Sequence, residues 1–232
     1  MSEILHCAGL SKSFGNVAAL DNVTLTLESG RIVGLLGPNG SGKTTLIKMI
    51  NGLLTPSAGY VRIEGELPGP STKTKVAYLP DNIYLNSWMT VKQIVEYFAD
   101  FYADFDQDRA YEMLNRLGIS SSKRLKTLSK GNKEKVCLIL VMSRQAKLYV
   151  LDEPIAGVDP AARDYVISTI INNYNPDATV LISTHLISDV EQVLDEVLFL
   201  QNGHLILHKS VDDIRAENGK SVDELFREVF RW

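Results

Sequence analysis

The segment Gly37-Pro-Asn-Gly-Ser-Gly-Lys-Thr-Thr45 indicates the fold class of this 232-residue chain. It matches the pattern G-x-x-x-x-G-K-[ST] and follows an apolar run at Ile32–Leu36 that predicts a buried strand. A segment with helical periodicity follows it, from about residue 43 to 53. The glycines allow a tight turn whose N–H groups point at phosphate oxygens, and a helix start adds partial positive charge. The segment therefore predicts a phosphate-binding loop between a strand and a helix.

Two side chains of this loop have defined expected roles. Lys43 would bring a full positive charge to the β- and γ-phosphates of a nucleotide, and the hydroxyl group of Thr44 would ligate Mg²⁺. A glycine-rich turn without a ligand is the alternative, and the full pattern in a strand–loop–helix context disfavours it. The expected nucleotide-binding set is Gly37, Pro38, Asn39, Gly40, Ser41, Gly42, Lys43, Thr44 and Thr45.

A second segment, Lys147-Leu-Tyr-Val-Leu-Asp-Glu-Pro154, predicts a buried strand that ends in two carboxylates. The carboxyl ends of strands form the edge of the sheet where α/β proteins bind ligands. Asp152 is the expected Mg²⁺ ligand, directly or through water, and Glu153 is the expected base that orients and deprotonates an attacking water. An acidic strand end facing solvent is the alternative, and the phosphate loop upstream favours the catalytic interpretation.

Hydrophobic periodicity divides the chain into three stretches. Residues 1 to about 86 indicate strands with one helix, and Val23, Leu25 and Leu27 alternate with threonines as in a half-buried strand. Residues 87–145 indicate helices only, and the remainder returns to alternating strands and helices. This order predicts an α/β fold with one sheet covered by helices, interrupted by an all-helical insertion at 87–145.

The insertion carries an apolar stripe at 91–105 and two runs of charge. The stripe predicts core packing, and a surface role for part of it is the alternative. Residues 96–112 hold six acidic side chains against one arginine, and residues 123–135 hold six basic side chains against one glutamate. We expect two solvated faces that partly neutralise each other. A membrane-surface or nucleic-acid patch is disfavoured because no aromatic residue interrupts the basic run.

Composition excludes several classes of protein. The chain has 24 Lys and Arg against 28 Asp and Glu, so its net charge of −4 argues against a nucleic-acid partner. Its apolar runs are too short for a transmembrane helix, and the first residues do not resemble a signal peptide. Cys7 and Cys137 are expected in the core, without a disulfide, as in a cytosolic protein.

Four segments together resemble the ABC-type ATPases. They are the phosphate loop, the strand ending at Asp152, the Gly157-Val-Asp-Pro160 segment and the Ser183-Thr-His185 segment. The resemblance spans nearly the whole chain. It implies a single domain over 1–232 with a RecA-like P-loop NTPase core, an N-terminal antiparallel β subdomain and the helical insertion. It also implies ATP and Mg²⁺ as cofactors, and a homo- or heterodimer of ATPase subunits that closes head to tail on ATP.

The resemblance implies roles for further residues. Phe14 matches the aromatic residue that stacks on adenine, Asp159 matches the loop that communicates across the dimer, and His185 matches the switch histidine that reaches the γ-phosphate. Two motifs depart from the family pattern. Asp81 replaces the glutamine that senses Mg²⁺, and Leu128-Ser-Lys-Gly-Asn132 replaces LeuSerGlyGlyGln. Within that signature Ser129 and Gly131 are retained, whereas Lys130 and Asn132 differ.

The resemblance implies an ATP-hydrolysing subunit of a membrane transporter whose permease is a separate chain. Such a subunit is cytoplasmic and peripheral on the inner face of the membrane. The surface near Trp88 and the 91–105 helix is then the expected docking site for a permease helix. One alternative is an ABC-type ATPase of a soluble assembly, although the compact single cassette lacks the tandem domains or coiled coils of such proteins. A P-loop kinase is a third, which gives no reason for Ser129–Asn132 or His185.

Overall fold

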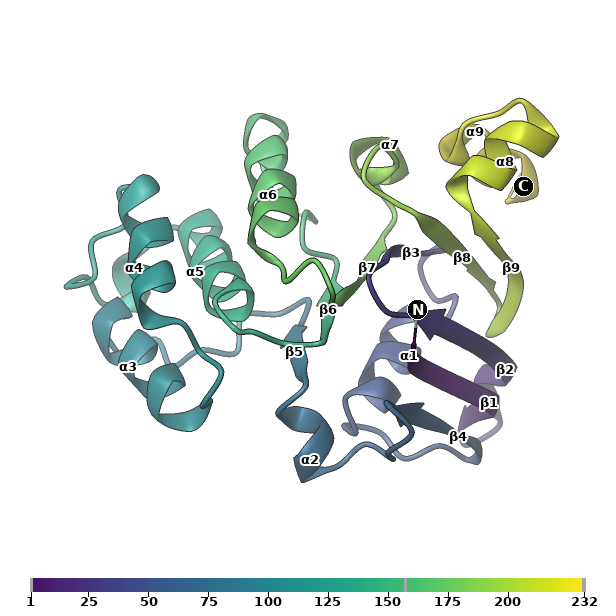
Figure 1. The fold of residues 1–232 in the computed structure, drawn as a ribbon, viewed down its shortest axis with the longest axis horizontal. Helices are drawn as coiled ribbons and strands as arrows, with labels where there is room; N and C mark the ends of the chain where they lie inside the picture. The colour runs from purple at the N-terminus through teal and green to yellow at the C-terminus, as the bar shows by residue number, and fades with distance from the viewer. Residues whose placement is uncertain (1, 157, 231–232) are drawn as a thin grey trace.

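The larger of two β-sheets forms the centre of the molecule in the computed structural model, which describes residues 2–156 and 158–230 (Figure 1). Five of its six strands are parallel neighbours, and the sixth pairs antiparallel with the last of these at one edge of the sheet. A hairpin turn at Asn202 and Gly203 joins this antiparallel pair, with positive φ angles of 48° and 81° as a tight hairpin turn requires. The strand order is β5 (Val76–Leu79), β6 (Leu148–Asp152), β7 (Thr179–Thr184), β3 (Ile32–Leu36), β8 (Glu196–Gln201), β9 (His204–Ser210).

A second, three-stranded antiparallel sheet packs against one face of the first (Figure 1). Its order is β2 (Val17–Glu28), β1 (Glu3–Phe14), β4 (Ala58–Ile63). Val23, Leu25 and Leu27 are buried, and the residues between them are exposed, so the predicted alternation is confirmed. Helix α1 (Lys43–Ile50) and alternate residues of the central strands complete this core. The observed architecture is the expected P-loop NTPase fold with an N-terminal antiparallel sheet.

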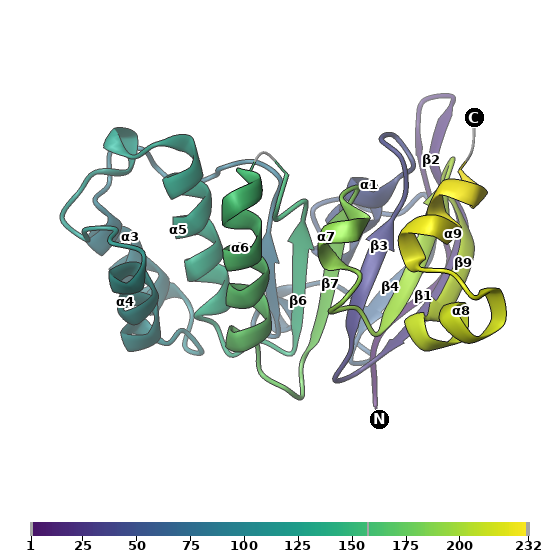
Figure 2. The same ribbon diagram turned by 90° about the horizontal axis from the view of Figure 1, so that it is seen from above.

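Helices cover the other face of the central sheet and extend beyond one of its edges (Figure 2). Helix α6 (Pro160–Asn173) and the short α7 (Ile187–Val190) lie over the middle of the sheet, and α8 (Val211–Asn218) and α9 (Val222–Val229) lie near β9. Helices α3 (Val91–Phe101), α4 (Gln107–Arg116) and α5 (Lys130–Met142) gather beyond the β5 edge. None of the described helices has the length and hydrophobicity needed to span a bilayer.

Some element boundaries differ from the sequence-based expectations. Helix α1 ends at Ile50, three residues before the expected end, because the chain turns at Gly52, which has a positive φ of 66°. The one-turn helix α2 (Pro70–Lys73) lies between β4 and β5, where the sequence indicates strands and a single helix. Phe101 was expected in the core but is 66% exposed and stacks on exposed Tyr97. The apolar stripe of α3 is therefore part core and part surface.

Buried Arg144 joins the helical group to the central sheet. Its guanidinium donates hydrogen bonds to Asp104 and to the backbone carbonyl of Val76 on β5. The same group lies over the ring of Tyr102, 3.9 Å from its centroid. The backbone carbonyl of Arg144 accepts a 2.5 Å hydrogen bond from the hydroxyl of Tyr149 on β6. Removing this side chain would leave several buried partners unsatisfied, so it fixes the position of α5 beside the sheet.

Candidate functional site

The phosphate loop follows β3 and turns directly into α1, as the sequence predicts. Gly42 precedes the helix with φ at 108°, a conformation that other residues rarely adopt. A Cβ atom at Gly42 would lie 2.5 Å from the backbone oxygen of Ala19, and one at Gly37 would lie 2.3 Å from that of Leu200. Both glycines are therefore required by close backbone contacts. Among the described residues no side chain caps the N-terminus of α1, so its N–H groups remain available to an anion.

Lys43 begins α1, and its buried side chain folds back over the loop. Its ammonium group donates hydrogen bonds to the carbonyl oxygens of Gly37 at 2.7 Å and Pro38 at 3.2 Å. Burial lowers the pKa of Lys43, and the nearby charges of Glu153 and Asp152 raise it in part. The site therefore holds a desolvated cation that a bound anion would stabilise.

Asp152 lies at the carboxyl end of β6 and is 1% exposed. Its Oδ1 accepts a 2.5 Å hydrogen bond from the hydroxyl of Ser183, whereas its buried Oδ2 has no hydrogen-bond partner among the described residues. Burial raises its pKa, the Ser183 bond lowers it, the charge of Asp81 raises it, and the nearby hydroxyl of Thr44 lowers it. A carboxylate oxygen and a hydroxyl together are ligands that Mg²⁺ prefers. The expected pair, Asp152 and Thr44, thus fits this ion.

Glu153 adopts a left-handed backbone conformation, with φ at 51°. Its N–H donates to the hydroxyl of Ser183 at 3.0 Å, and its Oε2 lies 2.9 Å from Nδ1 of His185. Such a strained conformation in a non-glycine residue costs free energy and is found most often at functional sites. The carboxylate points toward an open depression beside the phosphate loop, lined by Asn39, Asp81, Lys130, Glu153 and His185 among others.

Ser183 is a site residue for which the sequence predicts no role. It is the penultimate residue of β7 and lies directly opposite Asp152 in the parallel register of β6 and β7. One hydroxyl group therefore orients both acidic residues, donating to Asp152 and accepting from the Glu153 N–H. The phosphate loop follows β3, the neighbour of β7 on its other side. All three strands end at the same edge of the sheet, which is why the side chains converge there.

Asp81 lies in the segment after β5, is exposed, and accepts a hydrogen bond from Nδ2 of Asn82 at 2.9 Å. It borders the depression that contains Glu153 and His185. It also borders a groove of about 580 Å³ on the other side of the segment. That groove is rich in aromatic side chains, and the residues that line it include Lys48, Leu53, Tyr78, Tyr84, Phe101 and Tyr102.

The expected docking surface near Trp88 and the 91–105 helix contributes Phe101 to this groove, whereas Trp88 does not line it. A smaller pocket beside the groove shares Tyr84, Phe101 and Tyr102 with it, and Trp88 is absent from that pocket as well. Phe101, at 66%, is the most exposed of the three shared aromatic residues. Phe101 therefore marks the groove.

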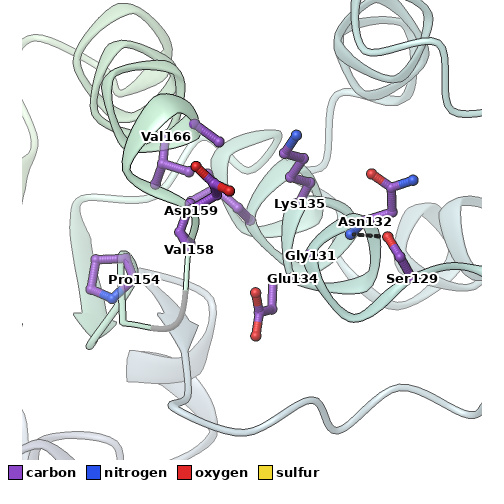
Figure 3. Close-up of a pocket in the computed structure, with 11 residues that line it drawn as sticks. Ser129, Gly131, Asn132, Glu134, Lys135, Pro154, Val158, Asp159 and Val166 are labelled. Atoms are coloured by element: carbon purple, nitrogen blue, oxygen red, sulfur yellow. Dashed lines mark hydrogen bonds between the residues drawn. The ribbon is translucent and has the colours of Figure 1, made fainter.

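Ser129, Gly131 and Asp159 lie together in a separate cavity of about 300 Å³ between α5 and the start of α6 (Figure 3). The hydroxyl of Ser129 caps α5 by accepting from the N–H of Asn132 at 3.3 Å. No residue of the phosphate loop lines this cavity among those described. The predicted nucleotide contacts therefore form two groups within one chain. Lys130 borders the depression beside the phosphate loop, whereas the adjacent residues Ser129 and Gly131 line the other cavity.

Phe14 stands apart from both groups at the end of β1. Its ring is 51% exposed, and the ammonium group of Lys12 lies 5.3 Å from the ring centroid. An exposed ring is free to stack on a flat ligand such as a nucleobase. The ring is therefore accessible for the expected contact with adenine, although it lines neither cavity with the phosphate loop or with Ser129.

The fold and the phosphate loop define a P-loop NTPase, and comparisons with known proteins identify the family. Residues 20–156 match the family model described as ABC transporter, which is more than half of the chain. The chain therefore belongs to the family of ABC transporter ATP-binding proteins.

Individual relatives agree with this assignment. The SkfA peptide export ATP-binding protein SkfE of Bacillus subtilis is 30% identical over 97% of this chain and 98% of its own length. The ABC transporter ATP-binding protein YtrB of the same species is 32% identical over 90% of this chain and 72% of its own length. A solved structure of an ATP-binding subunit of an ABC transporter is 31% identical, covers 98% of this chain and 100% of its own, and superposes with a TM-score of 0.88.

We expect Asp152→Asn to stabilise the nucleotide-free protein at pH 7 while weakening its Mg²⁺-dependent binding of ATP. Asparagine keeps an oxygen for the Ser183 bond and replaces the charged Oδ2, which has no hydrogen-bond partner among the described residues, with a neutral amide nitrogen. A buried charge costs more than a buried neutral polar group, and a gain of about 1 kcal/mol in a domain of this size raises Tm by roughly 2–4 °C. Thermal unfolding without Mg²⁺ measures the difference.

The stabilisation by Asp152→Asn should depend on pH. Because the pKa of Asp152 is raised in the folded state, the folded protein binds this proton more tightly than the unfolded chain does. The ionised carboxylate therefore destabilises the wild type above that pKa, and the difference between the proteins should shrink as the pH falls through it. Exposed Asp164→Asn on α6 is the control and should show no such pattern. Equal Tm values for wild type and Asp152→Asn at pH 7 would contradict the expected cost of the buried charge.

Proposed function

We propose that this protein binds and hydrolyses MgATP and thereby powers a membrane transporter whose permease is a separate chain. One observation supports the coupling above all: Asp81 borders both the depression beside the phosphate loop and the aromatic groove. A side chain placed between the two can respond to the nucleotide on one side and to a partner on the other. The family membership and the fold support the same function.

The residues of the sheet edge supply the chemistry of hydrolysis. The N–H groups of the phosphate loop and Lys43 would bind the β- and γ-phosphates. Glu153 would accept a proton from the attacking water. His185, whose Nδ1 lies 2.9 Å from the Glu153 carboxylate, would contact the γ-phosphate oxygens. Asp152 and Thr44 would hold Mg²⁺, which when bound neutralises charge on the phosphate oxygens. Asp81 would lie beside that ion. Its side chain carries a negative charge, which the glutamine that it replaces in the family pattern lacks.

The second cavity suits a nucleotide that is bound by a second ATPase subunit. Ser129, Gly131 and Asp159 line a space that contains no phosphate-loop residue of the same chain among those described. Backbone N–H groups at the start of α5 suit a phosphate group, and a triphosphate held by a second subunit would supply it. We propose that two subunits, identical or different, close on ATP in this way, with Phe14 stacking on the adenine.

Co-expression with a multi-span membrane protein encoded beside this gene tests the function. The proposed function predicts co-purification in detergent and an ATPase rate that changes when the two are reconstituted together. Fractionation of native cells provides an independent measurement, with the chain expected in the membrane fraction. An ATPase that remains in the soluble fraction with a non-membrane complex would favour a soluble assembly instead. Absence of ATP hydrolysis in the complex would contradict both functions.

Phe101→Glu should abolish co-purification with the permease and leave the ATPase rate of the isolated chain unchanged. The side chain is exposed in the aromatic groove, and a carboxylate there would be desolvated against an apolar partner helix. Loss of a buried aromatic contact together with burial of a charge should weaken docking by at least about 3 kcal/mol, more than a hundredfold. Affinity capture by the tagged permease measures the loss. Ile206→Glu, on an exposed position of β9, is the matched control. Unchanged capture of folded Phe101→Glu would place the docking site elsewhere.

A further inference from the structure

A short antiparallel pairing of two loop segments forms one end of the helical group. The N–H of Lys126 donates to the carbonyl of Ser87 at 2.8 Å, and the N–H of Leu125 donates to that of Met89 at 2.9 Å. Further along, the N–H of Val91 donates to the carbonyl of Lys123 at 3.0 Å. Residues 87–91 and 123–126, far apart in the sequence, therefore lie side by side.

Side chains of this pairing divide between an inner and an outer face. Leu125 is buried and Met89 packs against the core, so both point inward. Trp88 and the two neighbours of Leu125 face outward, because Trp88 is 63% exposed and Arg124 and Lys126 are both exposed. The result is a surface, here called the Trp88 face, formed by Trp88, Lys123, Arg124 and Lys126.

The positive charge of the Trp88 face is not neutralised by the rest of the protein. Within residues 2–156 and 158–230, no acidic side chain lies within salt-bridge distance of Lys123, Arg124 or Lys126. The acidic run at 96–112 makes its ion pairs elsewhere, with Lys92, Arg116 and Arg144. No ion pair joins the acidic run to the basic run among the described residues. Since the net charge of the chain is −4, this cationic surface is a local feature.

We propose that the Trp88 face binds the anionic headgroups of a lipid bilayer. An exposed tryptophan flanked by lysine and arginine suits the boundary between water and lipid, where the indole enters the headgroup layer and the cations meet phosphate groups. The sequence alone disfavoured such a patch because the basic run contains no aromatic residue. The fold supplies one from another segment.

The position of the face also favours a bilayer over an acidic protein segment. Asn86 and Met89, on either side of Trp88 in the chain, line the pocket that adjoins the aromatic groove. A permease helix seated in that groove would bring the Trp88 face close to the membrane. Trp88 projects from the surface rather than lining that pocket or the groove, so it presents an insertion element and not a receptor for a peptide. The inference rests on the proposed attachment to a membrane protein, yet its test requires neither a permease nor ATP hydrolysis.

Vesicle flotation with the purified full-length chain tests the proposal. The chain should bind vesicles that contain phosphatidylglycerol, should not bind pure phosphatidylcholine, and should dissociate as salt is raised. Each cation near an anionic membrane contributes about a fivefold gain in affinity, so Lys123→Gln/Arg124→Gln/Lys126→Gln should lose about a hundredfold. A variant with the same change in net charge, Arg116→Gln/Lys209→Gln/Lys220→Gln, should bind as the wild type does.

Tryptophan fluorescence provides a second readout that does not depend on the triple variant. The chain contains two tryptophans, so Trp232→Phe leaves Trp88 as the sole reporter. Its emission should shift to shorter wavelength and become quenched by lipids brominated near the headgroup when phosphatidylglycerol vesicles are added.

Several results would overturn the proposal. They are equal binding to both kinds of vesicle, equal loss in the two triple variants, or an unchanged Trp88 emission in the bound state. Binding of a soluble poly-glutamate peptide without binding to vesicles would overturn it in favour of an acidic protein partner. ATP hydrolysis measured on the same samples separates these outcomes from failure of the proposed function.

Discussion

Glu153→Gln should slow ATP hydrolysis by about 10²–10⁴-fold and leave ATP binding nearly unchanged. The amide cannot accept a proton from water, but it is the same size as the carboxylate and can occupy the same position beside His185. The strained backbone at φ 51° is held by the N–H bond to Ser183, which the substitution does not touch. Steady-state phosphate release and calorimetric titration with ATP in Mg²⁺ measure the two effects. Because ATP would then persist, the variant should also form an ATP-dependent dimer on size-exclusion chromatography.

Glu112→Gln, on the exposed surface of α4, is the control for Glu153→Gln and should hydrolyse ATP at the normal rate. His185→Ala separates the contributions of the pair. It removes the contact to Oε2 of Glu153 and should lower the rate with the general base still present. Hydrolysis at the wild-type rate by Glu153→Gln would refute the assignment of Glu153 as the base and leave Asp152 as the nearest alternative carboxylate.

Features set by local sequence could be predicted reliably. The phosphate loop requires glycines at fixed positions because the backbone turns sharply and approaches other backbone atoms, and that requirement is written in nine consecutive residues. The buried strand before Asp152 and the helix start at Ser129 are likewise local patterns. The convergence of the phosphate loop and Asp152 at one sheet edge could be predicted as well, because parallel strands that end in polar residues share that edge.

Features that depend on contacts between distant segments could not be predicted. Ser183 acquires its role only because β6 and β7 are neighbours in register. Arg144 became a buried link through partners on three separate segments, and Trp88 gained its basic neighbours through a loop pairing with no repeat or spacing in the sequence. The exposure of Phe101 has the same origin, because periodicity shows an apolar face but not whether another element covers it.

The fold allows two partners for Lys130: the nucleotide of its own chain and that of a second subunit. Its side chain is 78% exposed at the start of α5 and lies only loosely paired, 3.9 Å from Glu134. It borders the depression that holds Asn39 and Glu153 of its own chain, whereas its neighbours Ser129 and Gly131 line the other cavity. Lys130 could therefore face either the nucleotide of its own chain or that of a second subunit. Charge reversal at this residue distinguishes the two arrangements.

Lys130→Glu should block ATP-driven dimerisation and hydrolysis while leaving ATP binding to the monomer nearly intact. A carboxylate would replace an ammonium group opposite a triphosphate held by the second subunit. Two like charges about 4 Å apart repel by about 4 kcal/mol at an effective dielectric constant near 20, close to a thousandfold in affinity. Size-exclusion chromatography in the Glu153→Gln background measures the dimer, and calorimetric titration of dilute protein measures binding to the monomer.

Two further variants serve as comparisons for the binding and dimerisation measurements on Lys130→Glu. Lys43→Ala should weaken ATP binding to the monomer, because Lys43 lies within the phosphate loop of the same chain and is a desolvated cation there. Lys92→Glu reverses a charge on the exposed surface of α3, away from both cavities, and should change neither binding nor dimerisation. If Lys130→Glu weakens binding to the monomer as strongly as Lys43→Ala does, then Lys130 acts on the nucleotide of its own chain. The head-to-tail arrangement would then lose its support at this residue, and Ser129, Gly131 and Asp159 would need another explanation for their shared cavity.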